Sequence, residues 1–216
     1  SDISEAKTNV EDNKIRAWVN CPRRLNKFYV ELVSKLKSQN IKNFKVSGSN
    51  YGMACNAIHF LDLFSFLADK IDYQIDLSQV QKVEPSKRSN FVEFFGRITG
   101  GFIDGPEFLL ECNSTDEGVG FVVEIETEDN SYIIDEINRD VKVQGKSSEL
   151  DMVNEFRQPF QSEITGPMVD EIIESGECKL TEFNESMKLH SPFIIAAYNL
   201  YASKFGENSE KVVPIT

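Results

Sequence analysis

The 216-residue sequence contains none of the short motifs that carry a complete phosphate, metal or nucleophile site. It has no GxGxxG after a predicted strand, no GxxxxGK(S/T), no HExxH and no GxSxG. A self-contained nucleotide-binding loop is therefore excluded. Candidate chemistry has to come from side chains that the fold brings together.

Positive charge and long apolar runs are also scarce. The formal net charge of −12 leaves no basic stripe to displace the counterions of a nucleic acid or to bind an anionic membrane surface, so neither is an expected partner. No window approaches the roughly 20 apolar residues that a membrane span needs. With 40% hydrophobic residues the chain can bury a substantial core, and we interpret its acidity as a contribution to solubility.

Disulfide and metal-binding patterns are absent as well. The four cysteines, at positions 21, 55, 112 and 178, form no CxxC pair, and there are only two histidines. We predict no metal site, reduced thiols and a cytoplasmic protein. The first dozen residues lack an apolar signal-peptide core, and because the sequence starts at Ser1 we expect part of the native protein to precede it.

The spacing of apolar residues predicts an α/β (α+β type) fold with an open, mostly antiparallel sheet of about five or six strands and helices packed on one face. Residues 15–20 are predicted as a buried strand, 25–37 as a helix, 44–47 as a strand and 81–90 as a loop. The predicted meander comprises residues 91–99, 107–113, 118–128, 131–136 and 141–144. Apolar groups expected on its open face suggest a homo-oligomer that pairs through the sheet, with incidental exposure as the alternative; they are Phe94, Ile98, Leu109 and Ile133.

Prolines mark the predicted starts of the last two helices. Thr165-Gly166-Pro167 and Ser191-Pro192 each place proline in a first turn, which is a favoured position. The first of these helices is predicted to bury Val169, Ile172 and Ile173, and the second to bury Ile194, Ala197, Tyr198 and Tyr201.

A helix predicted over residues 52–67 has two distinct faces. Its buried stripe is predicted to comprise Met53, Ala57, Phe60, Phe64 and Leu67. Cys55, Asn56, His59 and Asp62 follow another face at steps of three and four residues, and we expect Asp62 to face water or to cap a neighbouring group.

This order of elements resembles the C-terminal substrate domain of the glucose–fructose oxidoreductase, inositol dehydrogenase and MocA family. The segment WVNCPRR is similar to the last strand of that family's nucleotide-binding domain running into the first helix of its substrate domain. His59 matches the family's histidine, and Cys55 occupies the position of an aspartate four residues earlier. The segment LTEFNESMKLHSPF and the ending VVPIT are similar to sugar and surface-polysaccharide oxidoreductases.

The resemblance implies a two-domain parent enzyme in which a Rossmann domain binds NAD or NADP. Residues 1–20 would be a remnant of that domain, and 21–216 the substrate-binding and oligomerisation domain. The Rossmann glycines and the lysine of the family's EKP motif are missing from this chain, so no cofactor is expected to bind to it.

His59 is the candidate catalytic residue, because an imidazole that titrates near neutrality can take or return a hydroxyl proton. The alternative is a hydrogen-bonded structural histidine, which is how we interpret His190.

Arg23 and Arg24 are candidates for clamping an anionic substrate group, or form surface ion pairs instead. Asn20 and Asn56 are candidates for binding sugar hydroxyls or for satisfying backbone groups. Asn56 is also placed to orient the imidazole of His59, while Cys55 offers a pocket thiol or merely packs as a small residue.

The sequence thus predicts the substrate-binding and dimerisation part of an NAD(P)-dependent oxidoreductase that acts on a hydroxyl or ketone of a sugar or sugar nucleotide, with surface-polysaccharide biosynthesis as a setting. The fragment alone is expected to be inactive. The alternative is a non-enzymatic module for sugar binding or assembly.

Overall fold

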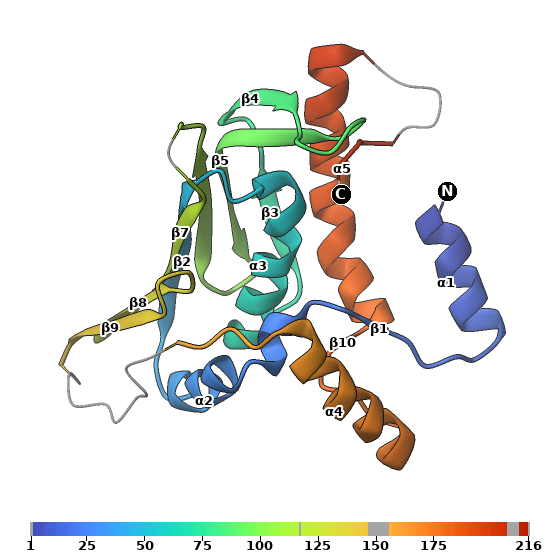
Figure 1. Ribbon diagram of the computed structural model, residues 1–216, viewed down its shortest axis with the longest axis vertical. Coiled ribbons are helices and arrows are strands. Elements are labelled where there is room, and N and C mark those ends of the chain that lie inside the picture. The colour runs from blue at the N-terminus through green and yellow to red at the C-terminus, as the bar shows by residue number, and fades with distance from the viewer. Residues whose placement is uncertain (1, 117, 147–155, 207–211, 216) are drawn as a thin grey trace.

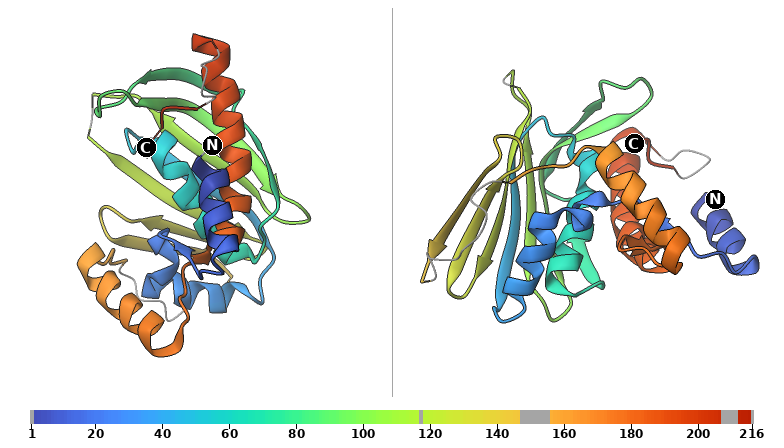
Figure 2. Two further views of the ribbon diagram at one scale, coloured as in Figure 1. Left: turned by 90° about the vertical axis from the view of Figure 1, so that its right-hand side faces the viewer. Right: turned by 60° about the horizontal axis from the view of Figure 1, so that its bottom comes forward.

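The computed structural model describes residues 2–116, 118–146, 156–206 and 212–215, and its main feature is an open eight-stranded sheet (Figure 1). Helices α2, α3 and α5 lie on one side of this sheet, and the right-hand view of Figure 2 shows the other side bare of helices. The elements are α1 (Asp2–Asp12), β1 (Trp18–Val19), a 3-10 turn (Pro22–Leu25), α2 (Lys27–Leu36), β2 (Ile41–Ser49), α3 (Met53–Ala68), β3 (Tyr73–Asp76), β4 (Val80–Pro85), β5 (Val92–Phe102), β6 (Glu107–Asn113), β7 (Gly120–Thr127), β8 (Asn130–Asp135), β9 (Asp140–Gly145), α4 (Gln161–Ser175), β10 (Thr181–Glu182) and α5 (Phe183–Phe205).

The predicted fold class is confirmed, with a larger sheet than expected. The strand order is β3-β5-β6-β2-β7-β8-β9, and β4 also pairs with β5. Only the β2–β6 pair is parallel, so the sheet is mostly antiparallel. The additional strands, β3 and β4, pair with β5, so residues 81–85 belong to the sheet and not to the predicted loop.

Central strand β2 follows the alternation expected for a sheet covered on one side. Phe44 and Val46 are buried against the helices, whereas Asn43 and Lys45 lie on the open face. The neighbouring strand β7 comes very close, because a Cβ atom on Gly48 would lie 2.1 Å from the backbone oxygen of Gly120. Glycine at this position therefore lets the two central strands pair.

Helix α3 forms the centre of the core. All five residues of its predicted stripe are buried, and Phe64 stacks on Phe44 of β2 with ring centroids 4.5 Å apart. At its start, Gly52 takes a left-handed φ of 75°, and a Glu93 carboxylate oxygen accepts a hydrogen bond of 2.6 Å from the backbone NH of Ala54. This contact from β5 satisfies an NH group that the first turn of the helix leaves free.

Some apolar residues face the opposite way from the prediction. Phe94 and Ile98 are fully buried under the helices, since both belong to the core face of β5. Leu109 and Ile133 do lie on the open face, as their pairing with Lys45, Thr99 and Glu124 shows. The open face is therefore more polar than the sequence suggested.

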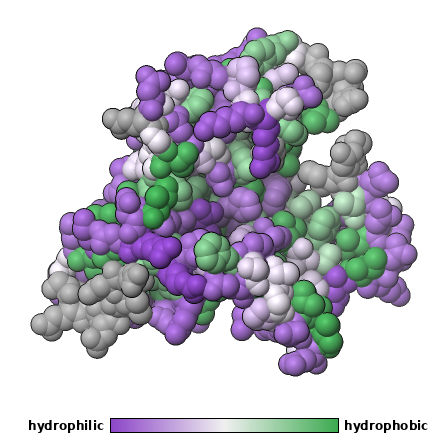
Figure 3. Space-filling view, in the orientation of Figure 1, coloured by the Kyte–Doolittle hydropathy of each residue, from purple (hydrophilic) through white to green (hydrophobic). Residues whose placement is uncertain are grey.

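Both C-terminal helices begin earlier than their prolines indicated. Helix α4 starts where Glu163 accepts a 2.7 Å hydrogen bond from the backbone NH of Phe160, and α5 follows directly on β10, so Pro167 and Pro192 lie inside helices. The predicted inner stripe of α4 was wrong: Val169 is 41% and Ile173 76% exposed. Figure 3 shows hydrophobic residues gathered over α4 at the surface. In α5, Ala197 is buried, and Ile194, Tyr198 and Tyr201 pack against the core as predicted.

A separate two-stranded ribbon ties the beginning of the chain to its last third. Trp18 and Val19 of β1 pair with Glu182 and Thr181 of β10. The predicted strand over residues 15–20 thus shortens to two residues, and it is not deeply buried, since Ile15 is 54% exposed. The ribbon places the turn after β1, the middle of α3 and the start of α5 beside one another.

Candidate functional site

The carboxylate of Asp62 connects these three segments. Its oxygens accept hydrogen bonds from Arg24 Nε at 2.9 Å and Nη2 at 3.0 Å, and from the hydroxyl of Thr181. The Asp62 side chain is only 1% exposed, so of the two predicted alternatives it does not face water, and it binds neighbouring groups instead. An unpaired buried carboxylate is costly, and here a guanidinium group and a hydroxyl group both stabilise it.

Arg23 has a carboxylate partner of its own. Its guanidinium group donates to both oxygens of Glu136 over 3.0 to 3.3 Å and lies 4.2 Å from the ring centroid of Phe60. Glu136 also accepts a hydrogen bond from the hydroxyl of Tyr29. Both arginines therefore form ion pairs, which favours the ion-pair alternative over the anion clamp. The pairs are largely buried, however, whereas surface pairs were predicted.

His59 lies half-buried in the middle of α3, three residues before Asp62. Its Nδ1 atom is buried and has no hydrogen-bond partner. Burial lowers the pKa of His59 and the positive charge of Arg23 lowers it further, whereas the negative charge of Asp62 opposes both effects. Since an ordinary histidine has a pKa of about 6.5, His59 is mainly neutral at pH 7 and can accept a proton.

The other predicted substrate-binding residues form no hydrogen bond with His59 in the described part of the chain. The amide nitrogen of Asn56 donates to the backbone oxygens of Tyr51 and Gly52, at 2.6 and 3.2 Å, so it supports the start of α3. Asn20 is exposed near the β1–β10 ribbon. Cys55 is half-buried one helical turn before His59, and no hydrogen bond joins the two side chains.

The sequence interpretation missed the contributions of Asp62, Thr181 and His190. His190 lies on α5, which packs against α3, and the charge of Asp62 acts on both imidazoles. Among these residues, the sequence indicated only Asp62, through its three-residue spacing from His59 on the same helix. Thr181 and His190 gave no such signal, because they come from a distant part of the sequence. Cys21 lies near the same carboxylate, and burial followed by the charge of Asp62 raises the pKa of its thiol to about 12, so it is no nucleophile at neutral pH.

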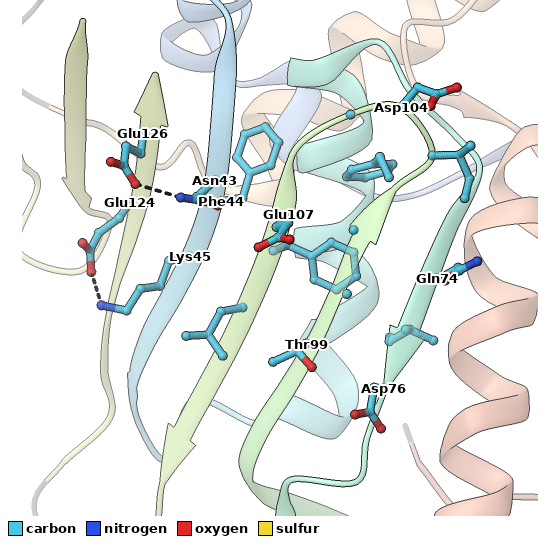
Figure 4. Close-up of a pocket in the computed structure, with 18 of the residues that line it drawn as sticks. Asn43, Phe44, Lys45, Gln74, Asp76, Thr99, Asp104, Glu107, Glu124 and Glu126 are labelled. Atoms are coloured by element: carbon cyan, nitrogen blue, oxygen red, sulfur yellow. Dashed lines mark hydrogen bonds and ion pairs between the residues drawn. The ribbon is translucent and has the colours of Figure 1, made fainter. Parts of the chain in front are cut away.

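A concave region lies on the open face of the sheet, on the opposite side from α3 and His59. Figure 4 shows this hollow, whose volume is about 1140 Å³. Lys45 pairs there with Glu124 at 2.9 Å, and Asn43 donates to Glu126 at 2.9 Å. Its 19 lining residues include five carboxylates and one lysine, and none of them is a histidine or a cysteine. Across the described part of the chain, no group of three histidine, cysteine, aspartate or glutamate residues is placed to hold a metal.

The described part of the chain also contains no helix that is long and apolar enough to cross a membrane. All four cysteine thiols are free.

No protein-family model and no curated protein matches the chain, whereas solved structures do. An oxidoreductase from Agrobacterium radiobacter, in complex with NAD+, L-tartaric acid and magnesium, matches with a TM-score of 0.65 and 13% identity, over 94% of this chain and 68% of its own. UDP-N-acetylglucosamine 3-dehydrogenase from Acidithiobacillus ferrooxidans matches with a TM-score of 0.63 and 8% identity, over 90% and 64%. A dehydrogenase from Clostridium difficile matches with a TM-score of 0.54 and 11% identity, over 86% and 61%.

These similarities show that the chain shares the fold of a large part of these oxidoreductases, so the resemblance stated from the sequence is confirmed at the level of the fold. The chain spans less than two thirds of the length of the last two of these proteins. At these low identities their activities and ligands do not transfer to the chain as findings.

We predict that Arg24→Ala destabilises the protein by about 3 to 5 kcal/mol, because it leaves the Asp62 carboxylate buried without its counter-charge. Arg97→Ala is the matched control: it breaks the pair with Glu111 at a side chain that is 52% exposed, and should cost less than about 1 kcal/mol. Urea denaturation of both variants measures the difference. Equal stability of the two variants would contradict the structural role and favour the anion clamp.

We also predict that Cys55→Asp raises the pKa of His59 by about 1 to 3 units, because a carboxylate one turn away favours the imidazolium form. Cys55→Asn is the uncharged control and should leave that pKa close to the parent value. Titration of the imidazole protons by NMR measures both. An unchanged pKa in the aspartate variant would show that position 55 does not face the ring.

Proposed function

We propose that this chain is the substrate-binding part of an NAD(P)-dependent oxidoreductase that acts on a hydroxyl or ketone group of a sugar or sugar nucleotide. The observation that supports this most directly is a neutral, half-buried imidazole with one orphaned nitrogen, His59, at the centre of an oxidoreductase fold. Similarity in fold to a UDP-N-acetylglucosamine 3-dehydrogenase supports the sugar-nucleotide class. The proposed setting in surface-polysaccharide biosynthesis rests on the resemblance of the segment LTEFNESMKLHSPF and the ending VVPIT.

In the proposed reaction His59 acts as the general base. In oxidation, the substrate carbon loses a hydride, its hydroxyl proton passes to the unprotonated nitrogen of the neutral His59 imidazole, and a carbonyl group forms. In reduction, the imidazolium returns that proton to the alkoxide oxygen. The Asp62–Arg24 pair holds α3 against the β1–β10 ribbon, and thereby fixes the position of the imidazole.

A nicotinamide cofactor supplies the hydride acceptor in this reaction. The chain has no glycine-rich phosphate loop, and the sheet hollow is rich in carboxylates, so the described residues do not fit a dinucleotide pyrophosphate. We therefore place the cofactor in a preceding domain of a longer parent protein, with residues 1–20 as the remnant of that domain and residues 21–216 as the substrate domain. On this proposal the fragment alone is inactive, and its free thiols suit the cytoplasm.

The test is an assay of nicotinamide reduction by the full-length protein against a panel of sugars and nucleotide sugars. We expect turnover with at least one of them, and expect His59→Ala to lower kcat by about 10² to 10⁴-fold, as loss of a general base does. Lys82→Ala, on exposed strand β4, is the control and should keep full activity. Unchanged turnover in a folded His59→Ala enzyme would eliminate the proposed role.

The thiol at position 55 supports an alternative proposal, in which the chain is a non-enzymatic module for sugar binding or assembly. The position that resembles a carboxylate in the family carries a thiol, and His59 Nδ1 remains without a partner. The reading frame upstream of Ser1 separates the two: a strand followed by GxGxxG and an EKP-like motif supports the enzyme, and their absence supports the module.

We further propose that two copies of the chain pair through the open face of the sheet. None of the described helices covers that face (Figure 2). Leu109 and Ile133 lie on it among polar side chains. Leu109→Asp should convert the dimer into a monomer in light scattering, because it buries a charge at the interface. Ile195→Asp, at a 61% exposed position on α5, is the control and should remain dimeric. A parent protein that is strictly monomeric would contradict this proposal.

A further inference from the structure

The open face of the sheet carries an excess of negative charge. The hollow on this face is lined by five carboxylates and one lysine, so the formal net charge of its lining is −4. Figure 4 shows Glu107 on β6 and Glu124 and Glu126 on β7, with β2 between these two strands. Any partner of this face therefore meets a concentration of carboxylates.

The cations that the strand register places on this face are already engaged. Three ion pairs hold them: Lys45–Glu124 at 2.9 Å, Arg97–Glu111 at 2.8 Å and Lys142–Asp140 at 3.1 Å. Each pair is neutral as a unit. The remaining carboxylates of the face are consequently left without a counter-charge from these three side chains.

Glu107 and Glu126 carry this uncompensated charge in the middle of the sheet. Both side chains are exposed, and they flank Asn43, which is opposite Glu107 on β6 and opposite Glu126 on β7. Glu126 accepts a hydrogen bond of 2.9 Å from the neutral Asn43 amide, and neither carboxylate forms an ion pair with a described residue. Two strand spacings place the carboxylates about 10 Å apart.

The next row of side chains along the same strands is attractive instead. Leu109 is opposite Lys45, and Ile133 is opposite Glu124, so an apolar side chain lies on each side of the neutral Lys45–Glu124 pair. Burial of Leu109 and Ile133 against a second copy stabilises a dimer without any contribution from charge. The face thus combines an apolar row with a neighbouring acidic row.

Symmetry decides the sign of the electrostatic contribution to pairing. Two identical chains that pair about a twofold axis bring the same patch of each copy together. A patch of net charge −4 then faces its own copy, wherever the axis passes through it. The resulting repulsion weakens as salt shortens the Debye length, which is about 10 Å at 0.1 M and about 3 Å at 1 M ionic strength.

We infer that ionic strength regulates the pairing of two copies through the open face: the row of Leu109 and Ile133 holds the copies together, and the row of Glu107 and Glu126 opposes them. This inference rests on the proposed pairing and deepens it. Interfaces built on complementary charges weaken as salt rises, whereas this one tightens.

Sedimentation equilibrium of the full-length protein tests the inference. Between about 0.1 M and about 1 M NaCl we expect the dissociation constant of the dimer to fall by about tenfold or more, because screening removes the repulsion between the two faces. The double variant Glu107→Gln/Glu126→Gln keeps hydrogen-bonding groups but removes both charges. It should dimerise about tenfold more tightly than the parent at the lower salt concentration, and should respond less to added salt.

The matched control is the double variant Asp170→Asn/Glu174→Gln. Both of its positions are exposed on α4, away from the open face, and it changes the net charge of the chain by the same amount. It should dimerise and respond to salt as the parent does.

The possible outcomes separate this inference from the pairing itself. A dimer whose dissociation constant is unchanged or rises with salt overturns the inference and leaves the pairing standing. Equal dissociation constants for the two double variants overturn it as well, since the total charge of the chain would then account for the salt response. A monomer at both salt concentrations overturns the inference and the pairing together, while the role of His59 is decided by its own assay.

Discussion

The position of the candidate site depends on one buried ion pair, between Asp62 and Arg24. A carboxylate that is 1% exposed tolerates burial only with matched partners, and those partners come from the turn after β1 and from β10. The pair therefore fixes the first residues of the domain, the middle of α3 and the start of α5 relative to one another. Both histidines lie within a few turns of these anchor points, so their mutual placement follows from the same pair.

Local patterns predicted most of the elements but few of the long-range partners. Helix α3 and the five meander strands follow from apolar periodicity, and their bounds agree with the structure to within about three residues. Strands β3 and β4 were missed because their pairing with β5 is a tertiary property, and the exposed stripe of α4 was misread because periodicity shows which face is apolar, not what covers it. In the site, His59 and its helix face were predictable. Thr181 was not, since it is 119 residues from Asp62.

The sheet separates the two proposed functions, substrate binding and pairing, onto opposite faces. Its covered face supports α3, α5 and the imidazoles, whereas its open face carries a polar hollow and the proposed pairing surface (Figures 2 and 4). Because strand alternation directs neighbouring side chains to opposite faces, changes at Lys45 or Leu109 need not disturb Phe44 or Leu110. Substrate chemistry and assembly can thus vary independently on the same strands.

The pairing of β1 with β10 has a consequence during synthesis. At about 5 to 20 residues per second, a ribosome needs about 6 to 24 s to add the 119 residues from Asp62 to Thr181. Throughout that interval the strands of the sheet can assemble on α3, while the ribbon and the helix that carries His190 do not yet exist. The sheet and α3 can therefore pack before α5 completes the core and the site, and a chain interrupted ahead of residue 181 would leave the Asp62 carboxylate without its last partner.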